Sequence, residues 1–179
     1  LVRSRGLGDV YKRQLHNKPG TITASQVGTI LGLNKYETAY ELWAKKTKRI
    51  PVFEGNVATR VGHHMENAIA GEYQIAHPDV KIINPGATTI CRHPELDWLV
   101  STVDRWIVES RKPLELKNSL ANDKTPWLED KGPLGYQLQL QTQMACTSAE
   151  AGELVALLGY QYVEHDHEYR SKLFDEYIV

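Results

Sequence analysis

An acidic residue followed by a Glu-x-Lys triplet stands in residues 101–117, STVDRWIVESRKPLELK. Asp104 lies among apolar residues in the first half, and Glu115 and Lys117 alternate with leucines in the second half. Because alternate side chains of a strand point to the same side, Glu115 and Lys117 share one face. The letters ESRK have turn character, so the two halves are expected to form a hairpin that brings Asp104 and Glu115 to one end.

The chemistry that these residue types favour is metal-assisted hydrolysis of a phosphodiester. Carboxylates that lie together repel each other and lose hydration unless a cation lies between them. Carboxylate oxygens select Mg²⁺, or Mn²⁺ in its place, over zinc. A lysine beside such an ion can orient or help to deprotonate a water molecule, while the ion stabilises charge on a phosphoryl oxygen. The alternative is an ordinary half-buried strand with a charged outer face.

Helices and strands that would position these residues follow from hydrophobic periodicity and from capping residues. The first helix has Thr21 or Thr23 as its candidate N-cap and ends at Gly32; Pro78 closes a long third helix. Helices are expected over residues 21–33, 37–49, 56–77 and 133–149, and from 168 onward; strands over 80–83, 87–92, 97–108, 113–118, 153–158 and 160–165. This order predicts one α/β (α+β) domain with a central mixed β-sheet flanked by helices.

Composition excludes several classes of protein. A chain of 179 residues can form one domain with a sizeable core. No apolar run is long enough for a membrane span and no secretory signal is visible, which indicates a cytoplasmic protein. Cys91 and Cys146 are far apart, so we expect free thiols; two cysteines are also too few for an iron–sulfur cluster.

The first fourteen residues, LVRSRGLGDVYKRQ, differ from the remainder because they have four basic residues and no apolar period. We interpret residues 1–14 as a translated sequencing-library end fused to a truncated start. The single domain would then be residues 15–179, with a final helix cut short. Without the first fourteen residues the net charge changes from −1 to −4. An acidic domain is not typical of nucleic-acid binding, so such binding would need a local basic channel.

Five motifs, in order along the chain, resemble the YqaJ-type viral recombinases, the family of lambda exonuclease. That family belongs to the restriction-endonuclease-like PD-(D/E)xK nucleases, whose core fold the resemblance implies. The motifs are ITAS with LGLNKYETAYELWAKKT, GHHMEN, HPELDWLVSTVD, Asp104 with ELK, and YQLQLQ. The resemblance extends over about residues 15–170, and ordered motifs are more specific than any one of them.

The resemblance implies roles for the catalytic candidates. Asp104, Glu115 and the backbone carbonyl of Leu116 would hold one Mg²⁺. Glu66, in GHHMEN, would help to hold a second ion or orient water, although a helical glutamate is often simply solvated. Lys117 would position or activate the attacking water.

Two further sets of residues take their roles from the same resemblance. Gln139 would orient the nucleophile or contact the phosphate backbone. Glutamines alternate from 137 to 143 and cannot all share one helix face, so the resemblance alone selects Gln139. Ser25, with Thr23 and Lys18, would receive the 5′ phosphate of a duplex end, because free N–H groups at a helix start suit an anion.

The implied function is a Mg²⁺-dependent, phage-type exonuclease that degrades one strand of linear duplex DNA. Its direction would be 5′ to 3′, leaving a 3′ strand for single-strand-annealing recombination. The resemblance further implies a trimeric ring, a single-strand annealing protein as partner, and a phage or prophage gene expressed in a bacterial host. Alternatives are another PD-(D/E)xK nuclease, RecB-like or CRISPR-associated, and a catalytically inactive DNA-binding module or fragment.

Overall fold

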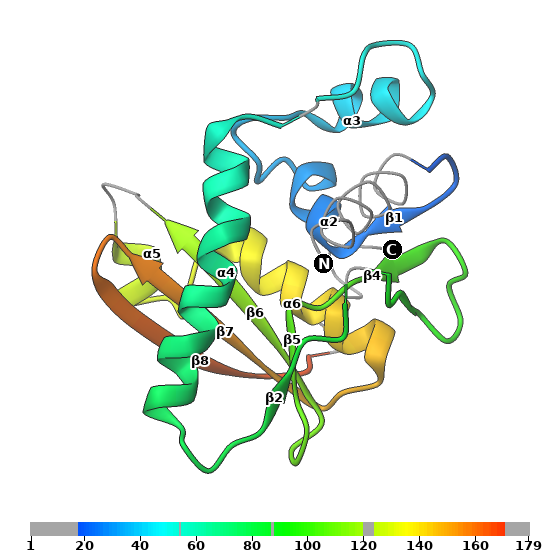
Figure 1. Ribbon diagram of the computed structural model, residues 1–179. Helices are drawn as coiled ribbons and strands as arrows, with labels where there is room; N and C mark the ends of the chain where they lie inside the picture. The colour runs from blue at the N-terminus through cyan, green and yellow to red at the C-terminus, as the bar shows by residue number, and fades with distance from the viewer. Residues whose placement is uncertain (1–17, 54, 87, 120–123, 171–179) are drawn as a thin grey trace, which may run out of the picture.

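Mixed helices and strands make up the part of the chain that the computed structural model describes, residues 18–53, 55–86, 88–119 and 124–170 (Figure 1). The helices are α2 (Ala24–Ile30), α3 (Ala39–Lys46), α4 (Val57–Ala76), α5 (Thr125–Leu128) and α6 (Leu134–Thr147). The strands are β1 (Ile22–Thr23), β2 (Ile82–Ile83), β3 (Cys91–Arg92), β4 (Leu99–Ser101), β5 (Arg105–Ile107), β6 (Lys112–Ser119), β7 (Ala151–Leu158) and β8 (Gln161–Glu168).

A five-stranded sheet in the order β2-β5-β6-β7-β8 forms the centre of the fold. Its strands pair antiparallel except for β6 and β7, which are parallel. A parallel pair needs a long crossover, and α5 and α6 supply it between these two strands. A smaller sheet, β1-β4-β3, joins the start of the described chain to β4 by a parallel pair. The predicted mixed sheet is confirmed.

Two layers of helix cover the two faces of the large sheet, with α4 on one and α6 on the other (Figure 1). The α4 layer contains Ile69, Ala70, Tyr73, Ile107, Leu114, Leu116 and Val155; the α6 layer contains Trp127, Leu140, Met144, Leu154 and Ala156. Leu114 and Leu116 of β6 therefore face α4. Because side chains alternate along a strand, Glu115 and Lys117 face α6.

The expected strand over residues 97–108 is wrong as one element. The structure divides it into β4 in the small sheet and β5 in the large sheet, with residues 102–104 between them. Apolar residues on both sides of the break hide it, because each group is buried in its own sheet. Asp104 is the last residue of the connection, at the point where the chain enters the large sheet.

Other boundaries differ locally from the expectation. Thr23 is the N-cap of α2, and Gly32 follows its end with a φ of 73°. The predicted helix begins too early, because Ile22 and Thr23 pair with Leu99 and Val100. Glu168, the expected start of the last helix, ends β8 instead.

The rest of the expected last helix, residues 171–179, and the segment 1–14 lie outside the described residues. Both cysteines are free thiols, as expected. Among the described residues no helix has the length and apolarity needed to cross a membrane.

Candidate active site

Asp104 and Glu115 lie side by side at the end of the β5–β6 hairpin. The last registered pair is Arg105 with Leu114, so the next position in each strand places Asp104 opposite Glu115. Asp104 Oδ2 accepts a hydrogen bond from the backbone N–H of Leu116, at 3.1 Å. The hairpin geometry predicted from the alternation of PLELK is therefore present, and the two carboxylates meet where β5 begins, beside the middle of β6.

The Glu115 carboxylate is almost completely buried, with 1% of the residue exposed. Its Oε1 accepts from Gln139 Nε2 at 2.5 Å and from the Lys117 ammonium, and its Oε2 accepts from Gln143 Nε2 at 2.5 Å. Burial, followed by the neighbouring charge of Asp104, raises the pKa of Glu115, while Lys117 and Gln143 act in the opposite direction. Two carboxylates therefore share one compensating cation, which leaves a local excess of negative charge.

Lys117 is that cation, and its contacts hold it over the carboxylate pair. Its Nζ donates to Glu115 and, at 3.1 Å, to Gln139 Oε1, and it lies 4.7 Å from the centre of the Tyr136 ring. Burial alone would lower the pKa of Lys117, but the Glu115 and Asp104 carboxylates outweigh burial and raise it. An ammonium donates hydrogen bonds and cannot accept a proton, so this arrangement favours positioning of a water over deprotonating it.

Gln143 is a residue of the site that the sequence reasoning did not select. It lies one helical turn after Gln139 on α6, and this i, i+4 spacing puts both amides on one face toward β6. Its Nε2 donates to Glu115 and also to the carbonyl of Thr102, at 3.1 Å. Its buried Oε1 has no hydrogen-bond partner among the described residues. The i, i+4 spacing links Gln143 to Gln139, but Gln137 and Gln141 have the same spacing, so only the packing of α6 on β6 identifies Gln143.

Replacing Gln143 by Leu is expected to destabilise the protein by about 1–3 kcal/mol, because Glu115 and the Thr102 carbonyl lose a buried donor. Any DNA-hydrolysing activity should fall by more than the loss of folded protein explains, since Glu115 loses a hydrogen bond that fixes the orientation of its carboxylate. Thermal denaturation and initial rates measure the two effects. Gln161→Leu, at an exposed residue of β8, is the matched control and should change neither.

Glu66 lies on α4, half-buried, close to the segment that carries Asp104. Its neighbour Asn67 accepts from Arg105 Nη2 at 2.7 Å, and Arg105 Nη1 donates to the carbonyl of Asp104 at 2.6 Å. These contacts tie this turn of α4 to the start of β5. Among the described residues, however, no three His, Cys, Asp or Glu side chains are grouped closely enough to bind a metal ion. The role of Glu66 stays a prediction.

The chemistry of the remaining donors fits a hard divalent cation. Asp104 and Glu115 supply carboxylate oxygens, and Leu116, whose N–H donates to Asp104, follows Glu115 in β6 and could add its backbone carbonyl. Burial and, after it, the charge of Asp104 raise the pKa of Glu115, and a bound cation would compensate that charge. All three donors are oxygens, a set that suits Mg²⁺ or Mn²⁺ and not zinc.

The candidate 5′-phosphate residues lie at the start of α2. Thr23 Oγ1 and Ser25 Oγ are 3.1 Å apart, and the backbone N–H of Thr23 donates to Gln26 Oε1 at 3.1 Å. α2 packs on α6, and a Cβ on Gly28 would lie 3.4 Å from the Gly135 Cα. Within the described residues no hydrogen bond joins the Lys18 ammonium to Thr23 or Ser25. The structure thus brings two of the three together, on a helix that rests on the helix of Gln139.

Lys46, a buried residue at the end of α3, holds the chain just before β1. Its Nζ donates to the carbonyl of Thr21 at 2.6 Å and to that of Lys18 at 3.4 Å. Burial lowers the pKa of Lys46 to about 8, against the opposing effect of Glu37. The sequence did not indicate a role for Lys46, because a lysine in the last turn of a helix is usually exposed.

The lowered pKa of Lys46 predicts a pH dependence of stability. Since the unfolded lysine binds its proton up to about pH 10.4, the unfolded state holds more protons than the folded state above pH 8. The contribution of Lys46 to the free energy of unfolding should therefore rise from pH 8 to pH 9.5. Urea denaturation of the wild type and of Lys46→Met at both pH values measures it, and only the wild type should show this rise.

Comparison with known proteins decides the family. Residues 14–150 match the sequence model of the YqaJ-like viral recombinase domain. The chain belongs to this family. It is 33% identical over 158 residues to the uncharacterized protein YqaJ of Bacillus subtilis (strain 168), an alignment that covers 86% of this chain and 49% of that protein. The chain thus spans about half the length of the curated relative that it matches.

Solved structures share the fold of this YqaJ-like chain. LHK-Exo, an alkaline exonuclease from Laribacter hongkongensis crystallised with dAMP, superposes with a TM-score of 0.71 at 22% identity, covering 93% of this chain and 84% of that one. A phage-related exonuclease from Haemophilus somnus 129PT superposes with a TM-score of 0.66 at 15% identity, covering 87% of each chain. At these identities the likeness establishes the restriction-endonuclease-like fold, which confirms the predicted fold class.

Proposed function

We propose that this YqaJ-family protein is a metal-dependent deoxyribonuclease, an exonuclease that degrades one strand of linear duplex DNA from 5′ to 3′. The observation that carries the proposal is the placing of Asp104 beside Glu115 at the start of β5, with Lys117 hydrogen-bonded to Glu115. Two proteins of the same fold are named as exonucleases, which supports the same class of activity. Degradation would leave a single strand with a 3′ end, which would serve single-strand-annealing recombination.

The proposed cofactor is Mg²⁺, with Mn²⁺ as a substitute, held by Asp104, Glu115 and the carbonyl of Leu116. A divalent ion supplies charge stabilisation at a phosphoryl oxygen and a more acidic bound water. Lys117 positions the attacking water through its N–H groups, and Gln139 fixes both Lys117 and Glu115 by its amide.

Outside this centre, we propose that Glu66 orients water or shares a second ion from its place on α4. Ser25 and Thr23 would receive the terminal 5′ phosphate with Lys18 as the neighbouring cation. The support is their shared position at the start of α2, which packs on the helix of Gln139. This geometry would place the end of the strand at a fixed distance from the scissile bond.

The assembly is also a proposal, supported by family membership. The protein would form a homo-oligomer, a trimer that encloses the duplex, and act with a single-strand annealing protein in the cytoplasm of a bacterial host carrying the phage or prophage. Size-exclusion chromatography with light scattering tests the trimer. A monomer at micromolar concentration would contradict it.

The deciding experiment uses the full chain and linear duplex DNA, labelled separately at each strand end. We expect release from the 5′-phosphorylated end with Mg²⁺ and none with EDTA. A duplex lacking the 5′ phosphate should be degraded more slowly if Ser25 and Thr23 bind that group. Cuts in circular DNA would instead indicate a RecB-like branch of the superfamily. DNA binding without cleavage in Mg²⁺ and Mn²⁺ would indicate an inactive module.

A further inference from the structure

Positive charge is concentrated at the C-terminal end of α3 and in the turn that follows it. Residues 42–52 contain Lys45, Lys46, Lys48 and Arg49 and no acidic residue, in a chain whose net charge is −1. A helix dipole favours cations in the last turn, which accounts for the first two lysines. Lys48 and Arg49 lie beyond the helix end, so the dipole does not account for them.

The four cations differ in how their charge is compensated. Lys45 pairs with Glu37 at 2.8 Å, and the buried Lys46 is bonded to backbone carbonyls. Lys48 and Arg49 are exposed, and no carboxylate of the described residues pairs with either. Lys48 and Arg49 are therefore two consecutive cations that face solvent without a carboxylate partner among the described residues.

The backbone conformation of the turn fixes the positions of the Lys48 and Arg49 Cα atoms. Lys48 adopts a left-handed backbone with a φ of 59°, and the backbone N–H of Arg49 donates to the carbonyl of Ala44 at 2.7 Å. The Arg49 guanidinium lies 4.6 Å from the centre of the Trp43 ring. Stacking on an aromatic ring orients a guanidinium while leaving N–H groups at its edge for an oxyanion.

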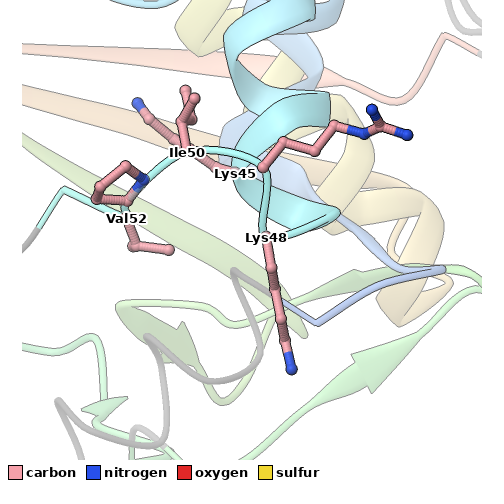
Figure 2. A pocket seen from close by; sticks show the side chains of 6 residues that line it. Lys45, Lys48, Ile50 and Val52 are labelled. Carbon is pink, nitrogen blue, oxygen red and sulfur yellow. The ribbon is translucent and has the colours of Figure 1, made fainter.

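An open hollow of about 420 Å³ lies at this turn. Its lining consists of Lys45, Lys48, Arg49, Ile50, Pro51 and Val52. Figure 2 shows Lys48 reaching away from the turn, with Ile50 and Val52 along the segment that follows. The hollow thus combines a cationic edge with an apolar wall, a combination that suits a polyanion with apolar groups, such as a nucleic-acid strand.

The position of the hollow relates it to the candidate DNA end site. Lys46 belongs to the same helix end and reaches the carbonyls of Lys18 and Thr21. Those residues immediately precede Thr23 and Ser25, the candidate 5′-phosphate ligands. The hollow and the start of α2 are therefore fastened together by one buried side chain, and one nucleic-acid strand could extend over both.

We propose that this basic hollow binds the phosphate backbone of DNA held at the active site, through Lys48 and Arg49. The inference rests on the proposed nuclease function and extends its DNA contacts to the end of α3. It provides the local basic surface that a chain of net negative charge needs for DNA binding.

The test is DNA binding by the full-length double variant Lys48→Gln/Arg49→Gln. Fluorescence anisotropy in EDTA, which prevents metal-dependent cleavage, is measured over a series of NaCl concentrations. Losing two phosphate contacts should reduce the salt slope of log affinity by about 1–2 and weaken binding roughly tenfold or more at low salt. Duplex and single-stranded DNA of equal length are measured separately, and the form that shows the loss identifies the strand bound.

The matched control is Lys81→Gln/Arg111→Gln. It also removes two exposed charges, and Arg111, like Lys48, has a left-handed backbone, with a φ of 54°. Lys81 precedes β2 and Arg111 precedes β6, at the opposite end of the molecule from α3 (Figure 1). The control should bind DNA as the wild type does, and circular dichroism should show that both variants fold.

Two results would overturn the inference: wild-type binding by Lys48→Gln/Arg49→Gln, or an equal loss in the control. Failure of the proposed function gives a different result, because the wild type itself would then not degrade linear DNA, whether or not it binds. Cleavage by the wild type together with unchanged binding by the double variant would reject the basic hollow alone.

Discussion

Lys117→Ala should lower the rate of DNA hydrolysis by about a thousandfold, within the range observed when a group that handles a proton or positions water is lost. The ammonium is the shared partner of Glu115 and Gln139, and it is the only cation that contacts the carboxylate pair among the described residues. Its removal leaves two carboxylates uncompensated and removes the N–H groups proposed to hold the water. Single-turnover rates with saturating enzyme isolate this step from DNA binding.

Lys112→Ala is the control for that experiment. Lys112 lies on the same strand and pairs with Glu153 and Asp166, away from the carboxylate pair. Its removal should leave the rate within about twofold, because surface ion pairs contribute little to stability or chemistry. A rate for Lys117→Ala close to that of Lys112→Ala would reject the site, and unfolding of Lys117→Ala is checked by its melting temperature.

Asp104→Asn should abolish activity to a similar extent while leaving the metal-free protein at least as stable. The amide oxygen of Asn can still accept the backbone hydrogen bond from Leu116, so the local geometry is kept. The charge beside Glu115 is removed, and with it one cause of the raised pKa of Glu115. When the pKa of a carboxyl is raised in the folded state, the free energy of unfolding falls as the pH rises through that pKa. This decrease should be smaller in Asp104→Asn than in the wild type.

Melting temperatures with EDTA compare the stability of the metal-free proteins, and melting temperatures with Mg²⁺ test whether the ion binds at Asp104. Mg²⁺ should stabilise the wild type by mass action and should not stabilise Asp104→Asn, which lacks one carboxylate ligand. Asp79→Asn, at an exposed position after α4, should respond to Mg²⁺ as the wild type does. Equal shifts in Asp104→Asn and the wild type would show that the ion binds elsewhere.

Local patterns in the sequence predicted the strand of the candidate site well and its surroundings poorly. The alternation of PLELK and the turn letters before it establish the β5–β6 hairpin, and hence the meeting of Asp104 with Glu115. These are short-range features, which periodicity detects. The break between β4 and β5 was missed because two groups of strand-forming residues look the same whether they lie in one sheet or in two.

Contacts between distant segments were the remaining failures. The helix expected from residue 21 starts after β1, whose partner β4 lies more than seventy residues away and leaves no local mark. Gln143 could be separated from the other glutamines only by knowing that α6 packs across β6. The burial of Glu115 was missed for the same reason, a contact between distant segments. Its strand alternates as a half-exposed strand does, but α6 covers the polar side.

The two parts of the site are joined by chain segments of very different length. Asp104, Glu115, Lys117, Gln139 and Gln143 span only 40 residues, whereas the start of α2 is fixed by the pairing of β1 with β4 across the intervening α3, α4 and β2. Closing a long loop costs more entropy than closing a short one, and a strand of two residues has few hydrogen bonds to lose when it opens. The centre that would cut DNA can therefore persist while β1 detaches. Selectivity for strand ends would then be lost before the chemistry itself.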